Sequence, residues 1–211
     1  MIITDIIKEK KHLCRVVFDC GREELLDVDT VSVSCLHKQD SITEEKLTEI
    51  IAESNYNRAK NRALWYLDRR AYTEKELYNK LLQKGFERKA LARVVARFVE
   101  LGLLDDRRFA ENYLEQLYGA NTSKREVYHK MINKGIPKSL IDELLESQEV
   151  DEGAQIREII NKKYRFKLEA QENVKKVYAA LVRKGFSYSA VRRELYSYSE
   201  EIKNKEFSEE F

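Results

Sequence analysis

The sequence predicts a mostly α-helical protein, with three tandem three-helix repeats in an elongated, curved array and a small N-terminal lobe that contains β structure. Helix breakers are rare, since the 211 residues include one proline and seven glycines. Lys-Gly-Phe at 84–86 recurs as Lys-Gly-Ile at 134–136 and as Lys-Gly-Phe at 184–186, 50 residues apart both times. Apolar and tyrosine positions keep the same step: Leu77, Val127 and Val177; Tyr78, Tyr128 and Tyr178; Leu81, Met131 and Leu181; Leu91, Ile141 and Val191.

The N-terminal lobe is expected to span residues 1–54. Residues 13–18 are apolar and β-branched, and Asp-Cys-Gly at 19–21 is a turn signal, so residues 24–28 can pair back as a hairpin. Residues 31–36 fit either a strand or a short helix. From Thr43 onward, helical spacing of apolar residues predicts a helix that leads into the first repeat.

The first repeat is expected at residues 55–104. Its first helix carries an apolar stripe from Ala59 to Leu67, and Thr-Glu-Lys-Glu at 73–76 has the form of a capping box for the second helix. Gly85 follows that helix, where a left-handed residue is typical. The third helix is predicted to end near Gly102.

The second and third repeats are expected at residues 105–148 and 149–199. In the second, Asp105 or Asp106 can cap the first helix, Ser-Lys-Arg-Glu at 123–126 forms another capping box, and Pro137 suits the first turn of the last helix. The third repeat has no capping box at 173–176, as expected of an atypical terminal unit. Residues 200–211 form an acidic C-terminal tail.

Composition excludes several classes of protein. No run approaches 18 apolar residues, which argues against a membrane-spanning helix, and the first residues lack the features of a signal peptide. Three cysteines are too few for a disulfide scaffold and indicate a reducing, cytoplasmic location. The sequence contains no phosphate-binding glycine loop, nucleophile elbow or metalloprotease motif, so we expect no catalytic residues and no cofactor.

A zinc site is the alternative use of the N-terminal cysteines and histidines. His12, Cys14, Cys20, Cys35 and His37 could supply ligands. Structural zinc sites, however, prefer closely spaced cysteine pairs, and none occurs here. We therefore favour reduced cysteines and no bound metal.

Charge is distributed unevenly along the chain. Residues 1–54 carry a net charge of −5, residues 55–199 carry +10 and residues 200–211 carry −3. The excess favours an anionic partner over simple solvation of helices. The candidate binding residues form two helical stripes and two later pairs of cations: Arg58, Arg62, Trp65 and Arg69; Lys89, Arg93 and Arg97; Lys124 and Arg125; Lys175 and Lys176.

Several motifs together resemble the RecX family. Ala-Leu-Trp-Tyr-Leu at 63–67, followed by Arg69 or Arg70, Thr-Glu-Lys-Glu-Leu at 73–77 and Lys-Gly-Phe at 84–86, is similar to the family's opening unit. Leu-Gly-Leu-Leu-Asp-Asp at 101–106 with Phe109 and Ala110 resembles a further signature of the family, and Lys-Gly-Ile-Pro at 134–137 looks like its second-unit motif. The resemblance covers about residues 1–200 and is most specific over 59–140. One departure is a linker glycine that is shifted to Gly119.

The resemblance implies a regulator, mainly an inhibitor, of the RecA recombinase. Such proteins are tandem three-helix repeats that bind the RecA–single-stranded DNA filament and limit its extension, ATP hydrolysis and strand exchange. They act in DNA repair, recombination and the SOS response, without enzymatic activity. We expect a cytoplasmic monomer that contacts single-stranded DNA directly or within the filament. Two alternatives remain, a helical-repeat nucleic-acid-binding module without a RecA role and a scaffold that binds protein alone.

Overall fold

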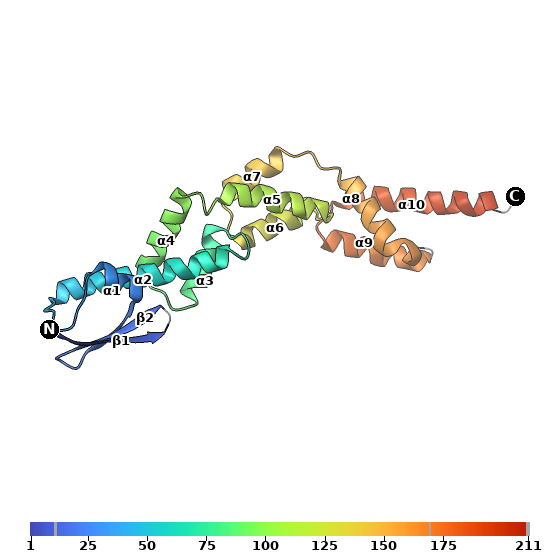
Figure 1. Ribbon diagram of the computed structural model, residues 1–211. Helices are drawn as coiled ribbons and strands as arrows, with labels where there is room; N and C mark the ends of the chain where they lie inside the picture. The colour runs from blue at the N-terminus through green and yellow to red at the C-terminus, as the bar shows by residue number, and fades with distance from the viewer. Residues whose placement is uncertain (11, 169, 210–211) are drawn as a thin grey trace. The chain divides into compact units, whose positions relative to one another are not determined.

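The computed structural model describes residues 1–10, 12–168 and 170–209 (Figure 1). It confirms a mostly helical protein with a small N-terminal sheet. The chain divides into two compact units, Met1–Asp105 and Asp106–Phe211. Each unit has its own buried cores, so each can be described by itself.

An antiparallel sheet of order β1-β2-β3 opens the first unit. It consists of β1 (Ile3–Lys10), β2 (Leu13–Phe18) and β3 (Glu23–Asp27). The β2–β3 hairpin is confirmed, and Gly21 takes a φ of +80° in its turn. Strand β1 was not predicted. Its Ile6-Ile7 step and two irregularities in its pairing with β2 hide the alternation that identifies a strand.

Two helices cover one face of the sheet. The short helix α1 (Val28–Val33) follows β3 directly and shows that residues 31–36 begin in a helix and not in a strand. The long helix α2 (Glu44–Leu67) begins after Thr43, whose hydroxyl accepts the amide of Lys46 at 3.2 Å. Apolar side chains of its first half pack with those of the sheet: Ile3, Val16, Phe18, Leu26, Leu47 and Ile50.

The second half of α2 belongs to the first repeat. Helices α3 (Glu74–Leu82) and α4 (Arg88–Glu100) pack against it, around a core that includes Ala59, Ala63 and Phe98. Figure 1 shows the sheet beside the first half of α2 and α4 crossing the same helix. The helix runs without a break across residues 54 and 55, where the sequence divides lobe from repeat. The division into an N-terminal lobe and repeats therefore remains a proposal.

The second unit contains two further three-helix sets. The first is α5 (Asp106–Gly119), α6 (Lys124–Lys134) and α7 (Lys138–Glu146). The second begins with α8 (Glu152–Ile159), continues through a π-helix (Ile160–Tyr164) and a 3₁₀ turn (Arg165–Lys167), and ends with α9 (Val174–Arg183) and α10 (Tyr188–Glu209). Helix α10 extends well into the acidic residues assigned to a tail.

The repeat register is confirmed residue by residue. The aligned apolar positions are buried in three separate cores: Leu77, Val127 and Val177; Leu81, Met131 and Leu181; Leu91, Ile141 and Val191. The hydroxyls of Thr73 and Ser123 each accept the amide of the third helical residue, as expected of capping boxes. Gly85, Gly135 and Gly185 share a left-handed φ of +84°, +87° and +91°.

Candidate nucleic-acid interface

The second half of α2 presents four of the predicted binding residues along one side. Arg58, Arg62, Trp65 and Arg69 follow one another at steps of four, three and four, and we call them the Trp65 cluster. The side chain of Arg58 is half-buried, and the other three residues are exposed. Among the described residues, none of the three arginines forms an ion pair. Their positive charge is therefore available to an external anion.

The indole of Trp65 organises this cluster. Trp65 is 45% exposed, and its ring meets that of Tyr66 edge-on, with centroids 5.2 Å apart. The guanidinium of Arg69 lies 3.3 Å from the indole centroid and donates to the Trp65 carbonyl at 2.7 Å, while that of Arg62 lies at 5.5 Å. Cation–π contacts of this kind hold guanidinium groups against an aromatic face without neutralising them. The arrangement combines a partly exposed ring with cations that form no ion pair within the described part of the chain.

A surface hollow of about 700 Å³ adjoins the Trp65 cluster. The cluster's Arg58, Arg62 and Trp65 line it together with residues of the N-terminal lobe, of α2 and of the α3–α4 loop: His12, Leu13, Asp27, Asp29, Asn61 and Phe86. The carboxylate of Asp27 is buried and caps α1 by accepting the amides of Asp29 and Thr30. Asp27 and the exposed Asp29 thus place two carboxylates in the hollow beside its two arginines. Its arginine side is the part that can accommodate an anion.

Phe86 and Asn61 were missed as residues that line this hollow. Phe86 belongs to the repeated Lys-Gly-Phe motif, which the sequence explains as a helix ending. Only the return of the α3–α4 loop toward α2 brings Phe86 beside the arginines. Asn61 lies between Arg58 and Arg62 on α2, so its place in the sequence could have been used to predict that it lines the hollow.

The second predicted stripe, formed by Lys89, Arg93 and Arg97 on α4, lies on a different surface from the Trp65 cluster. Arg93 forms an ion pair with Glu53 of α2 at 2.9 Å, and its guanidinium lies 4.3 Å from the Tyr56 ring centroid. At about 100° per residue, Glu53 and Tyr56 face almost opposite to the Trp65 cluster on α2. Arg97 pairs with Glu100 at 3.0 Å, while Lys89 is exposed. The structure thus separates Lys89, Arg93 and Arg97 from the Trp65 cluster and neutralises two of them.

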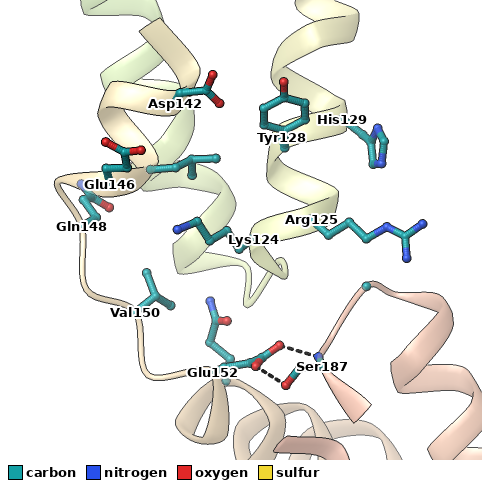
Figure 2. A pocket seen from close by; sticks show the side chains of 13 residues that line it. Lys124, Arg125, Tyr128, His129, Asp142, Glu146, Gln148, Val150, Glu152 and Ser187 are labelled. Carbon is teal, nitrogen blue, oxygen red and sulfur yellow. Dashed lines mark hydrogen bonds between the residues drawn. The ribbon is translucent and has the colours of Figure 1, made fainter. Parts of the chain in front are cut away.

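Lys124 and Arg125 occupy the first turn of α6, in the second unit. They border a hollow of about 690 Å³, and Figure 2 shows their side chains pointing in opposite directions. The same hollow contains His129 and three carboxylates, those of Asp142, Glu146 and Glu152. Glu152 accepts hydrogen bonds from the amide and hydroxyl of Ser187, at 2.7 and 2.6 Å (Figure 2). Charge of both signs makes this hollow a weaker candidate for a polyanion.

Lys175 and Lys176 lie on the first turn of α9. Lys176 donates to the side-chain carbonyl of Asn173 at 3.3 Å. Lys175 borders a shallow hollow of about 340 Å³ with Arg192, and its apolar wall includes Tyr178 and Leu195. The predicted binding residues therefore occupy several distinct surfaces, of which the Trp65 cluster is the best organised.

The described residues contain neither a metal-binding cluster nor a membrane-spanning helix. No group of three or more His, Cys, Asp or Glu side chains in that part of the chain is placed to hold a metal ion. Cys14 is buried in the N-terminal core, while Cys20 and Cys35 are exposed, and all three are free. Within residues 1–10, 12–168 and 170–209, no helix combines the length and hydropathy needed to cross a bilayer.

Comparison with known proteins decides the family. Residues 59–98 match the family model of the first three-helix domain of RecX, and residues 151–195 match that of its third. The regulatory protein RecX of Clostridium tetani is 33% identical over 153 residues, which cover 70% of each chain. The chain belongs to the RecX family. The regulatory protein RecX of Caldanaerobacter subterraneus is 30% identical over 84% of this chain and 92% of its own.

Solved RecX structures share the fold. A crystal structure of regulatory protein RecX aligns with 92% of this chain and 98% of its own, at a TM-score of 0.66 and 20% identity. RecX from Lactobacillus salivarius aligns with 69% of this chain and 97% of its own, at a TM-score of 0.59 and 19% identity. The first-domain match includes Arg62, Trp65 and Arg69, so three of the four residues of the Trp65 cluster stand within a recognised RecX domain.

Proposed function

We propose that this protein regulates RecA, mainly as an inhibitor, by binding the RecA–single-stranded DNA filament. Membership of the RecX family is the observation that carries the proposal. Binding limits filament extension, and with it ATP hydrolysis and strand exchange. The protein acts by occupying a surface, without catalysis, as a cytoplasmic monomer.

The Trp65 cluster is the proposed DNA contact. Three arginines that form no ion pair with any residue the structure describes can replace counterions along a phosphate backbone, and this exchange supplies most of the non-specific affinity of such proteins. The Arg69 guanidinium covers one face of the Trp65 indole, so a base would stack on the rest of the exposed ring or displace that guanidinium. Together they favour single-stranded over double-stranded DNA. Lys124, Arg125, Lys175 and Lys176 are proposed as further contacts to DNA or to acidic RecA surfaces.

Simultaneous contacts explain how a modest interface can regulate a filament. Contacts from more than one repeat to a filament give avidity without high affinity at any one site. A molecule bound at a growing end opposes the addition of every later subunit. We therefore expect inhibition at amounts well below one regulator per RecA subunit.

The second candidate is a nucleic-acid-binding module without a RecA role. The Trp65 cluster supports it equally, because neither arginines nor an indole require RecA. The two functions differ in what a RecA assay reports, whereas binding to DNA alone does not separate them.

RecA-catalysed ATP hydrolysis on single-stranded DNA is the test. Substoichiometric amounts of this protein should lower the steady-state rate with RecA from the same organism. The control adds the protein at saturating DNA, where competition for free DNA is negligible. Unchanged ATP hydrolysis under both conditions, with DNA binding intact, would contradict the RecA role and support the module.

A further inference from the structure

An exposed aromatic residue of the third repeat lies within a run of cations in the sequence. Residues 161–167 read Asn-Lys-Lys-Tyr-Arg-Phe-Lys, and we call them the Phe166 segment. Its four cations are Lys162, Lys163, Arg165 and Lys167. Phe166 is 81% exposed, the greatest exposure of any aromatic side chain whose burial the structure describes. Nothing assigned to the proposed function explains an uncovered phenyl ring at this position.

The backbone holds Phe166 away from the core. Helix α8 changes to a π-helix at Ile160–Tyr164 and then to a 3₁₀ turn at Arg165–Lys167. Tyr164 and Leu168 both pack against the core of the third repeat, and the amide of Leu168 donates to the carbonyl of Tyr164 at 3.0 Å. Phe166 stands midway between these two anchors. A π-helical turn inside a helix is often found at a functional site, because it redirects side chains that a regular helix would bury.

The charge of the Phe166 segment is mostly uncompensated. Lys162 pairs with Glu158, and the Lys167 ammonium lies 6.0 Å from the ring centroid of Tyr164. In the part of the chain that the structure describes, Lys163 and Arg165 form no ion pair. At least two cations that lie close to Phe166 in the sequence therefore keep their charge available. A ligand that matches both features carries regular negative charge and flat, unstacked rings.

We propose that the Phe166 segment is a second binding site for single-stranded nucleic acid, in which a base stacks on Phe166 and phosphates contact Lys163 and Arg165. Every base has a face that can stack, so the site is tolerant of sequence. It deepens the proposed function by adding a contact in the third repeat, in a different unit from the Trp65 cluster. It rests on DNA binding alone and does not require the RecA role.

Two other ligands fit less well. A duplex keeps its bases stacked and offers Phe166 no free face, so only the cations would contribute. An anionic lipid surface could attract the same cations, but stable membrane binding grows with the apolar area that enters the interface. Here Tyr164 is half-buried and Leu168 is buried, which leaves one phenyl ring to insert. Single-stranded nucleic acid uses both features of the segment.

A tryptophan at position 166 gives a direct reporter, because the chain has one tryptophan, Trp65. In the Trp65→Phe background, Phe166→Trp should show fluorescence quenching as a short oligodeoxythymidylate is titrated in. The matched control is Val33→Trp in the same background. Val33 is 84% exposed but lies in the acidic N-terminal lobe, so its signal should stay constant.

Affinity measurements separate stacking from other roles of the ring. Phe166→Ala should weaken oligodeoxythymidylate binding about 5-fold to 150-fold, as measured by anisotropy of a labelled strand. Phe166→Leu should lose as much, because leucine lacks a π face, while Phe166→Tyr should bind like the parent. Double substitution of Lys163→Gln and Arg165→Gln should reduce the magnitude of the salt slope by about 1.4, from about 0.7 per lost contact. Circular dichroism should show unchanged helix content in all four.

Three outcomes would overturn the proposal. The first is parental affinity in Phe166→Ala, the second is parental affinity in Phe166→Leu with loss in the alanine variant, and the third is no binding of oligodeoxythymidylate by the parent. A tryptophan signal at position 166 that responds to anionic vesicles and not to the oligonucleotide would assign the segment to membranes instead. Because no RecA is present, failure here is distinguishable from failure of the proposed function.

Discussion

At the scale of single residues, the Lys-Gly-Phe motif has different surroundings in the first and third repeats. Gly85 and Gly185 share a left-handed backbone, yet their surroundings differ. A Cβ added at Gly85 would meet nothing within 4 Å, whereas one at Gly185 would lie 2.7 Å from the hydroxyl of Ser123 and 3.1 Å from the Cβ of Arg125. That hydroxyl also donates to the carbonyl of Lys184 at 2.5 Å, so Gly185 permits the second and third repeats to meet.

Alanine at these two glycines should therefore have unequal effects. Gly85→Ala should lower the free energy of unfolding of its unit by about 1–2 kcal/mol, because an L-residue must adopt positive φ. Gly185→Ala should cost about 1 kcal/mol more, since the Ser123–Lys184 hydrogen bond must also yield. Urea unfolding followed by circular dichroism gives both values. Ser123→Ala removes the cap of α6 in either background, but it should cost less in Gly185→Ala than in the parent, because the Ser123–Lys184 hydrogen bond has already yielded there. Equal costs at the two glycines would refute the close-contact explanation.

The binding role of the Trp65 cluster stays a prediction, but its placement on one side of α2 could be read from the sequence. Spacing along one helix was enough to place Arg58, Arg62, Trp65 and Arg69 together. It could not show that Arg93 pairs with Glu53, because these residues are 40 positions apart and meet only when α4 packs on α2. The sequence also could not reveal that Phe166 is exposed. It does not predict the π-helix and the 3₁₀ turn, and a regular helix would have pointed Phe166 in another direction.

At the scale of elements, the helices that the sequence predicts are those with capping residues at their starts or glycines at their ends. Thr73 and Ser123 cap the starts of α3 and α6, and glycines follow the helix ends. Such signals depend on neighbouring residues alone. Strand β1 was missed because its irregular pairing breaks the alternation of a regular strand. The continuity of α2 across the lobe and the first repeat was also beyond local signals. One helix serves two cores there, with Leu47 in one and Ala63 in the other.

An ion pair between two elements of the second repeat gives stability that depends on pH. Arg107 of α5 donates two hydrogen bonds to Glu143 of α7, both at 2.9 Å. These bonds hold the pKa of the Glu143 carboxyl below its ordinary value. A carboxyl with a lowered pKa in the folded state stabilises the protein above its unfolded pKa of about 4.3. That contribution is lost as the pH falls through the folded pKa.

Glu143→Gln should accordingly unfold at lower urea concentration than the parent near neutral pH. The difference should be small, because both side chains are more than half exposed. It should shrink as the pH falls below about 4 and be absent once the parent's carboxyl is protonated. The measurement is the urea midpoint across a pH series. A difference that is constant with pH would mean that the pair's charge has no part in stability.

At the scale of the whole molecule, the helical repeats present separate charged surfaces, and we propose that one of these surfaces regulates RecA. The uneven charge along the chain predicted an anionic partner, and the structure shows which cations keep their charge available. Arg58, Arg62 and Arg69 surround an exposed indole without ion-pair partners among the described residues, while Arg93 and Arg97 are paired within the fold. The central claim is that the Trp65 cluster, and not the α4 stripe, carries the binding that regulates RecA.

Two variants with equal loss of charge test that claim most directly. One replaces Arg58, Arg62 and Arg69 with glutamine, and the other replaces Lys89, Arg93 and Arg97 with glutamine. Each removes three positive charges from the same unit, and circular dichroism confirms that both keep their helices. The measurement is inhibition of RecA-catalysed, single-stranded-DNA-dependent ATP hydrolysis as each protein is titrated in. The account predicts that the first variant loses most of its inhibition and the second keeps most of it. Parental inhibition by the first variant, or equal loss in both, would contradict the account.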